Sequence, residues 1–240
     1  MVKIRVGKDE GKYTESELLE IMRALRAPGG CPWDIEQTHK SIRNDLLEEA
    51  FEVADAIDTS DSEALCEELG DLLLQVVFHS VISEEEKLFD YSDVVDGIAR
   101  KLILRHPHVF GEAKAENSAE VLDLWDDIKK QEKHQATATD TLKSVPRAFP
   151  ALMRAAKVQK RAKKAGYEFS DPVKSGELTR LCETLSKLYE TDKQAAADTY
   201  GKLLFELSRL GKELGVDPEE RLGIETDRFI ESFEKEEKGN

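Results

Sequence analysis

Apolar residues recur at helical intervals in two neighbouring stretches, and this spacing restricts the fold more than any other feature of the chain. The first stretch holds Leu46, Leu47, Ala50, Phe51, Ala54 and Ile57, and the second Leu65, Leu69, Leu72, Leu73, Val76 and Val77, with the small Ser80 continuing the same spacing. Intervals of three and four residues put these side chains on one face of a helix, which predicts two helices facing a core. The connection, residues 58–62, is short and built from residue types that cap helices. We therefore expect an antiparallel pair.

The rest of the chain also favours helix. A third helix is expected from Ser92 to Arg105, where His106-Pro107 ends it, and a fourth from Ser118 to Glu132. Asp217-Pro218 followed by two glutamates is a strong helix start. No stretch shows a convincing strand pattern, and charged residues make up 35% of the chain against 7% aromatic. The sequence predicts an all-α fold.

The chain resembles two copies of one unit. A shift of 131 residues places apolar and glycine positions of the first half on matching positions of the second, among them Leu47 on Leu178, Glu52 on Glu183, Gly70 on Gly201, Leu72 on Leu203 and Leu73 on Leu204. Between the copies, residues 134–150 have little apolar periodicity and are expected to form a linker. We place the domains at residues 1–138 and 139–240.

The two copies differ in charge. Four acids of the first copy are replaced in the second, where Glu48, Glu49, Glu68 and Asp71 become Thr179, Arg180, Thr199 and Lys202. Because the apolar pattern persists while these charges do not, the acids are expected to serve chemistry and not packing. The second copy is then degenerate and non-catalytic, supplying packing or a dimer surface.

The acids of the first copy form two pairs. Glu49 with Glu52, and Glu68 with Asp71, are three residues apart and share a helix face. If the two helices face each other, four carboxylates converge, and a divalent cation would relieve their repulsion. Carboxylate oxygens suit Mg²⁺, with Mn²⁺ as the alternative. An ordinary solvated acidic face is a second interpretation, whereas a ferritin-like di-iron bundle needs two Glu-x-x-His motifs and only Glu36 with His39 forms one.

Composition excludes several classes of partner. The formal net charge of −15 disfavours nucleic acid, and no apolar stretch approaches the roughly 18 residues of a membrane span. The first ten residues mix charges instead of forming an apolar signal, so we expect a cytoplasmic protein. Cys31, Cys66 and Cys182 are widely separated, which indicates neither disulfides nor a thiolate zinc site and favours small buried side chains.

The acidic residues also carry a family resemblance. Glu48-Glu49-Ala50-Phe51-Glu52 and Glu68-Leu69-Gly70-Asp71 resemble the Glu-Glu-x-x-Glu and Glu-x-x-Asp signature of MazG-type nucleoside triphosphate pyrophosphohydrolases. Further segments are similar to MazG segments in MazG order: residues 30–34, 37–39, 70–79, 105–110 and 125–129 of the first copy, and 148–152, 166–167 and 214–220 of the second. The resemblance thus covers nearly the whole chain.

The resemblance implies helical bundles, usually paired in a homodimer, that hold Mg²⁺ against a nucleoside triphosphate and release a nucleoside monophosphate and pyrophosphate. Carried over by position, Glu49, Glu52, Glu68 and Asp71 are the metal ligands. Glu48, together with Glu49 and Glu52, is assigned to catalysis, either orienting a ligand or activating water. In-line attack by water needs no covalent nucleophile.

The resemblance also implies residues that bind the substrate. Lys101 and Arg105 lie four residues apart on one helix face, as do Trp125 and Lys129, and all four match MazG positions. The cations suit phosphate oxygens, although surface salt bridges are an alternative for each. Trp33 and Trp125 either stack on a nucleobase or fill the core, and we assign Trp33 to the base pocket.

Two functions from different classes follow. The first is Mg²⁺-dependent hydrolysis of nucleoside triphosphates, with broad specificity and a role in clearing the nucleotide pool. The second is a non-catalytic acidic scaffold or regulatory protein, in which metal only holds chains together. The retention of phosphate-binding cations beside the acids favours the enzyme, because a structural metal site has no use for them.

Overall fold

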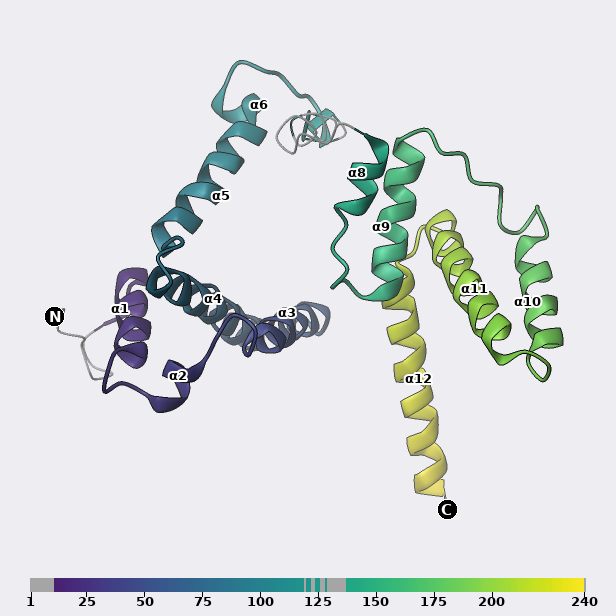
Figure 1. Ribbon diagram of the computed structural model, residues 1–240, viewed down its shortest axis with the longest axis horizontal. Coiled ribbons are helices and arrows are strands. Elements are labelled where there is room, and N and C mark those ends of the chain that lie inside the picture. The colour runs from purple at the N-terminus through teal and green to yellow at the C-terminus, as the bar shows by residue number, and fades with distance from the viewer. Residues whose placement is uncertain (1–10, 119, 122–123, 126–127, 129–136, 240) are drawn as a thin grey trace. The chain divides into compact units, whose positions relative to one another are not determined.

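The fold is all-α, as the sequence predicts. The computed structural model describes residues 11–118, 120–121, 124–125, 128 and 137–239, and these residues form helices and connections without a strand (Figure 1). Within the same residues, no helix combines the length and apolar character that crossing a bilayer requires.

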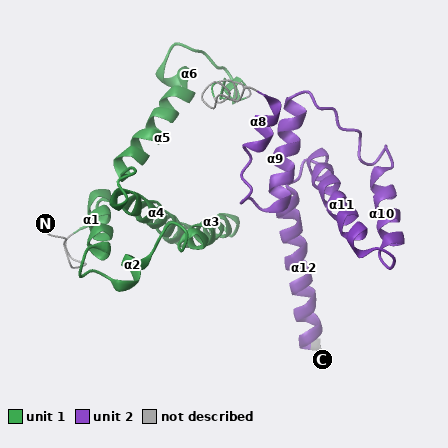
Figure 2. Ribbon diagram, viewed as in Figure 1, with its two compact units in different colours: residues 1–128 green, residues 129–240 purple. Residues whose placement is uncertain are grey.

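The chain divides into two compact units, residues 1–128 and 129–240 (Figure 2). We call them unit 1 and unit 2. The helices of unit 1 are α1 (Glu15–Arg26), α2 (Pro32–Glu36), α3 (Arg43–Asp58), α4 (Ser62–Glu85), α5 (Tyr91–Arg105) and α6 (Pro107–Phe110). Those of unit 2 are α8 (Ala138–Lys143), α9 (Ala151–Lys164), α10 (Glu177–Leu188), α11 (Lys193–Glu213) and α12 (Pro218–Gly239).

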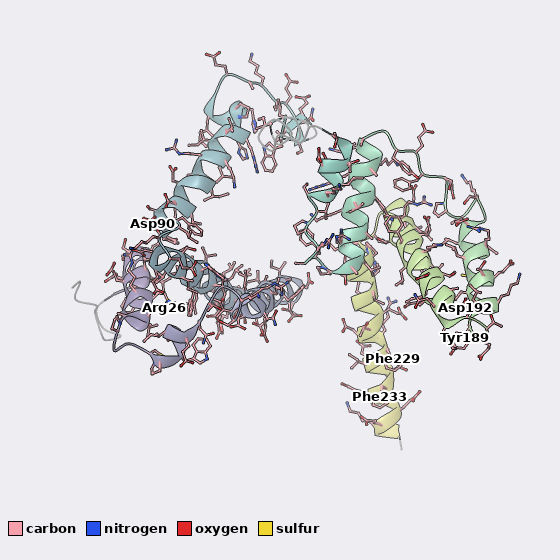
Figure 3. All side chains as sticks on the ribbon, in the orientation of Figure 1. Arg26, Asp90, Tyr189, Asp192, Phe229 and Phe233 are labelled. Carbon is pink, nitrogen blue, oxygen red and sulfur yellow. The ribbon has the colours of Figure 1, made fainter. Side chains whose placement is uncertain are left out.

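Capping side chains begin several helices where the sequence predicts. The carboxylate of Asp61 accepts hydrogen bonds from two backbone N–H groups in the first turn of α4, so α3 and α4 are joined by a three-residue turn. Asp90 and Asp93 form a capping box that begins α5 one residue before the expected Ser92 (Figure 3). Asp217 accepts two bonds in the first turn of α12. These helix starts are confirmed.

The core of unit 1 is formed by α1, the residue before α3 and the second half of α4. Its buried members are Met22, Ile42, Val77, Phe78, Val81 and Ile82. Two ion pairs connect α1 to the end of α4, Arg23 with Glu84 at 2.9 Å and Arg26 with Glu85 at 2.7 Å. Arg26 also lies 5.4 Å from the centre of the Phe78 ring, so its guanidinium covers the edge of the core (Figure 3).

The expectation that both apolar stripes face a core is wrong for much of α3 and for the first half of α4. Phe51 is 56% exposed, Ile57 57% and Leu69 49%, and Ala56 is the buried residue of α3. The physical reason is a lack of cover. In the described part of unit 1, α3 packs against α4, and the face carrying these side chains has no further helix over it.

Unit 2 also contains a packed helix pair. Helices α10 and α11 pack together, and α9 packs against α11, α12 and α8. Asp192 caps α11, and beside it the Lys193 ammonium lies 3.8 Å from the centre of the Tyr189 ring (Figure 3). A shift of 131 residues carries Ser62, the first residue of α4, onto Lys193, the first residue of α11.

Two smaller expectations are wrong. The predicted linker contains α8, because Thr137 and Asp140 form a capping box that starts a helix despite the weak apolar pattern. The cysteines are not buried: Cys66 and Cys182 are exposed and Cys31 is partly so, since the described helices leave their positions uncovered. The predicted fourth helix falls partly on residues outside the described ranges, and the described residues between 118 and 128 are helical.

The core of unit 1 can be tested with Ile42→Ala. Ile42 is 1% exposed, so truncation should lower the free energy of unfolding by about 2–5 kcal/mol. The two tryptophans, Trp33 and Trp125, both lie in unit 1, and tryptophan fluorescence during urea unfolding therefore reports that unit. Val109→Ala, at a side chain 63% exposed, should change stability by less than about 0.5 kcal/mol. Equal effects of the two substitutions would contradict this assignment of the core.

Candidate functional site

The antiparallel α3–α4 pair brings acidic side chains together. Glu49 on α3 and Glu68 and Asp71 on α4 each offer one carboxylate oxygen, and these oxygens all lie within 4.8 Å of one another. All three residues are partly buried. The grouping follows from the sequence, because residues three apart on α4 share a face and the short turn folds that face onto α3. We call these three residues the acidic cluster.

The carboxylates of the cluster repel one another. Partial loss of hydration raises the pKa of Glu49, and the charges of Asp71, Glu52 and Glu68 raise it further. The pKa of Glu68 is raised in the same way, by partial burial and by the charges of Glu52, Glu67 and Asp71. Each raised pKa means that negative charge is disfavoured at this place, which is the condition that a bound cation relieves.

Glu52 and Glu48 lie beside the cluster. Glu52 is exposed, yet its charge raises the pKa of both Glu49 and Glu68, which places its carboxylate near theirs. Glu48 is exposed on α3, where it lines a shallow groove together with Leu47, Phe51 and Glu52. None of the three residues of the acidic cluster lines this groove, so Glu52 is the residue that connects the groove with the cluster.

The acidic cluster could hold a metal ion. Carboxylate oxygens are the ligands that hard divalent cations prefer, and within the described residues this is the one group with such geometry. The corresponding positions of unit 2 are used differently. Arg180 pairs with Glu177 at 2.6 Å, and the buried Thr199 donates a hydrogen bond from its hydroxyl to the carbonyl of Ala195.

Two of the three predicted phosphate-binding cations, Lys101 and Arg105, lie on α5. Lys101 is exposed and Arg105 partly buried, and α5 packs against α4 and α6. Trp125 packs edge-on against His106, the residue that follows Arg105, with ring centres 4.8 Å apart. The end of α5 thus gathers Arg105 and Trp125, whereas Lys129 lies outside the described residues.

Trp33 lies elsewhere, beside the core of unit 1. It is 58% exposed, and its ring meets Phe78 edge-on with centres 6.5 Å apart. The described ring contact of Trp33 is thus with Phe78 of the core, and Phe78 does not belong to the acidic cluster. The structure thus brings together the acids of α3 and α4, whereas Trp33 lies on α2 and packs against Phe78 in the second half of α4.

A histidine pair was not singled out by sequence reasoning. The Nδ1 atoms of His39 and His79 lie 2.7 Å apart, and the hydroxyl of Ser83 lies 3.2 Å from His39 Nε2. Burial and the neighbouring His39 lower the pKa of His79. Both histidines stand in segments quoted for the family resemblance, but forty positions separate them and no helical spacing connects them.

Comparison with known proteins gives a consistent result. The family model described as MazG nucleotide pyrophosphohydrolase domain matches residues 37–110, which include the acidic cluster. The chain is 40% identical over 222 residues to the Thermotoga maritima nucleoside triphosphate pyrophosphohydrolase/pyrophosphatase MazG, covering 92% of this chain and 84% of that protein. It is 41% identical over 230 residues to the Escherichia coli nucleoside triphosphate pyrophosphohydrolase, covering 92% and 86%.

A third relative is longer. The uncharacterized protein YabN of Bacillus subtilis is 39% identical over 221 residues, which are 91% of this chain and 45% of YabN. The shared region therefore stands within a larger protein in that case. Together with the acidic cluster on an all-α fold, these likenesses show that the chain belongs to the MazG family of nucleotide pyrophosphohydrolases.

Proposed function

We propose that this protein hydrolyses nucleoside triphosphates to a nucleoside monophosphate and pyrophosphate, in a metal-dependent site in unit 1. The observation that carries the proposal is the acidic cluster, in which three carboxylates from two helices converge within 4.8 Å. Its relatives from Thermotoga maritima and Escherichia coli are named for this activity. A broad role in clearing the nucleotide pool fits a site whose described residues recognise charge.

The residues of the cluster fit a divalent cation, Mg²⁺ or Mn²⁺. We assign Glu49, Glu52, Glu68 and Asp71 as its ligands, since the oxygens of Glu49, Glu68 and Asp71 converge and the charge of Glu52 acts on Glu49 and Glu68. Bound there, the ion would neutralise triphosphate charge and stabilise the departing pyrophosphate.

Other residues of unit 1 would act on the substrate and water. Glu48 is exposed beside the cluster and is our candidate for accepting a proton from the attacking water or for orienting a ligand. Lys101, Arg105 and Lys129 would bind phosphate oxygens, with Arg105 able to form two parallel hydrogen bonds. Trp125 or Trp33 would stack on the base.

We further propose that residues 1–138 form the catalytic domain and that residues 139–240 form a degenerate, non-catalytic copy. Two observations support this division of roles. The described residues of unit 2 contain no group of three metal-ligating side chains, and the counterparts Arg180 and Thr199 bond within their own helices. Unit 2 would then contribute packing or an interface.

A homodimer is the third part of the proposal. The groove on α3 is lined by Leu47 and Phe51, and Phe51, Ile57 and Leu69 are each about half exposed. Side chains at helical spacing that remain uncovered within their own unit indicate a partner surface. A second copy of the chain suits them, because family resemblance implies paired bundles and each copy brings the same apolar face.

The activity is tested by pyrophosphate release from a panel of ribo- and deoxynucleoside triphosphates with and without Mg²⁺. Glu52→Gln should lower release more than about a hundredfold, because it removes a metal ligand. The matched control is Glu183→Gln, the counterpart in the second copy, which should leave release unchanged. Absence of release from every nucleotide would instead support the non-catalytic scaffold.

If the acidic cluster binds a metal ion, removing one of its carboxylates should change the melting temperature differently with and without Mg²⁺. Because the pKa values of Glu49 and Glu68 are raised in the folded state, their repulsion is absent below the ordinary carboxyl pKa and fully present at neutral pH. At pH 7 in a chelator, Glu68→Gln should therefore raise the melting temperature, while the gain on adding Mg²⁺ should disappear.

The control for this stability experiment is Glu112→Gln, at an exposed position outside the cluster. It should leave the melting temperature and its response to Mg²⁺ unchanged. A lower melting temperature for Glu68→Gln in chelator would show that the carboxylate stabilises the metal-free fold, contrary to the proposal.

The dimer is tested by Phe51→Glu, which places a charge on the apolar face of α3. Sedimentation velocity should show the native chain as a dimer and this variant as a monomer. Leu88→Glu introduces the same charge at a side chain that is 68% exposed and outside that face, and should remain dimeric. A native chain that sediments as a monomer at micromolar concentration would refute the proposal.

A further inference from the structure

Unit 2 contains a cavity that the hydrolysis of nucleoside triphosphates does not use. It measures about 540 Å³ and lies between the C-terminal ends of α9 and α11 and the loop that follows α9. Its lining includes Gln159, Lys163, Tyr167, Phe169, Arg209 and Lys212. Its size falls within the roughly 300–1,000 Å³ range of small-molecule sites.

One wall of the cavity is aromatic and is held by the backbone. Helix α9 ends in a Schellman motif, in which the N–H of Gly166 bonds to the carbonyl of Lys163 and the N–H of Tyr167 to that of Ala162. The φ of +88° at Gly166 is in the left-handed region that favours glycine. This turn directs the chain into the loop that carries Tyr167 and Phe169, whose ring centres are 4.7 Å apart.

Arg209 supports this wall from α11. It is 5% exposed, its guanidinium lies 5.4 Å from the centre of the Phe169 ring, and its Nε donates a 3.0 Å hydrogen bond to Glu206. With its charge paired with Glu206 and its guanidinium over the Phe169 ring, Arg209 supports the Phe169 side chain. The planes of the Tyr167 and Phe169 rings meet at 65°, so the wall presents one ring packed edge-on against the other.

The lining of the cavity also includes two lysines, Lys163 and Lys212. Partial burial, together with the charges of Lys160, Lys163 and Lys164, lowers the pKa of Lys212. The two acids of the lining, Glu168 and Glu213, offset part of this charge. Two helix C-termini account for about one more negative charge. Lys163 and Lys212 are the lysines that line the cavity itself, in a chain whose net charge is −15.

A buried acceptor without a donor provides the third, independent observation. Gln159 is 3% exposed, and its Nε2 donates a 2.7 Å hydrogen bond to the carbonyl of Phe205. Because only the amide nitrogen can donate to a carbonyl, the orientation of the amide is determined. Its Oε1 is buried and has no hydrogen-bond partner, although Gln159 lines the cavity. A ligand donor at this place would satisfy it.

We propose that this cavity binds a nucleotide whose base carries an amino group. The ring would stack on Tyr167, the amino group would donate to Gln159 Oε1, and the phosphate would lie against Lys163 and Lys212. The site belongs to unit 2, so it assigns a ligand to the copy that lacks the acidic cluster. It does not depend on the activity proposed for unit 1.

The test is calorimetric titration of the full chain in a chelator, which removes the divalent ion that the acidic cluster would use. The probes are AMP, CMP, UMP, adenosine and inorganic phosphate. AMP and CMP should bind more tightly than UMP, which has a carbonyl in place of the amino group. Adenosine and phosphate, each with half of the recognised chemistry, should bind more weakly than AMP.

Variants assign the binding to this cavity. Lys212→Gln should weaken AMP binding about tenfold, since it removes one charge-assisted contact. Lys187→Gln, at an exposed lysine on α10 outside the cavity, should have no effect. Gln159→Leu should abolish the preference for AMP over UMP, and far-ultraviolet circular dichroism verifies that this buried variant is folded.

Three results would overturn the proposal. One is no binding of any nucleotide at millimolar concentration. Another is phosphate binding as tightly as AMP, which would make the cavity an anion site without base recognition. The last is AMP binding that is unchanged in Lys212→Gln and lost in Arg105→Gln, which would move the nucleotide to unit 1.

Discussion

The repulsion among carboxylates on α3 and α4 is the constraint on which the organisation of unit 1 depends. A helix pair with a three-residue turn has little freedom, so acids on facing helix surfaces are forced to within 4.8 Å. The raised pKa values of Glu49 and Glu68 show that the fold tolerates an electrostatic cost here. Such a cost persists where a ligand offsets it, and a divalent cation is the simplest ligand that does.

The same helices are only half covered by their own unit. The core of unit 1 lies where α1 meets the second half of α4, while the acidic cluster lies along the first half, where Leu69 and Phe51 remain exposed. Electrostatic cost and missing apolar cover thus occur on the same two helices. A metal ion would offset the repulsion between the carboxylates, and a second copy of the chain would cover the exposed apolar side chains. Assembly and substrate binding would then be coupled through α3 and α4.

The sequence predicts local features of this fold well. Asp61, Asp90 and Asp217 mark helix starts because a cap acts on backbone groups within one turn, so nothing distant is needed to recognise it. The acidic cluster is likewise visible, since spacing three on two connected helices is enough. Prediction fails for burial, because whether Phe51 or Cys66 is covered depends on which other element packs there, and helical periodicity alone does not specify that element.

The cavity of unit 2 is a second feature that local sequence patterns do not predict. Its aromatic and basic cavity forms where the Schellman turn after α9 lies beside the end of α11. Because Gln159 and Arg209 are far apart in the sequence, no local pattern predicts that they line one cavity. The replacement of Glu49 and Asp71 by Arg180 and Lys202 changes the sign of charge on the helix pair. In a strongly acidic chain, removing these acids lowers the repulsion that an anion would meet on unit 2. The α10–α11 pair, with Arg180 and Lys202, therefore repels an anion less than the α3–α4 pair does.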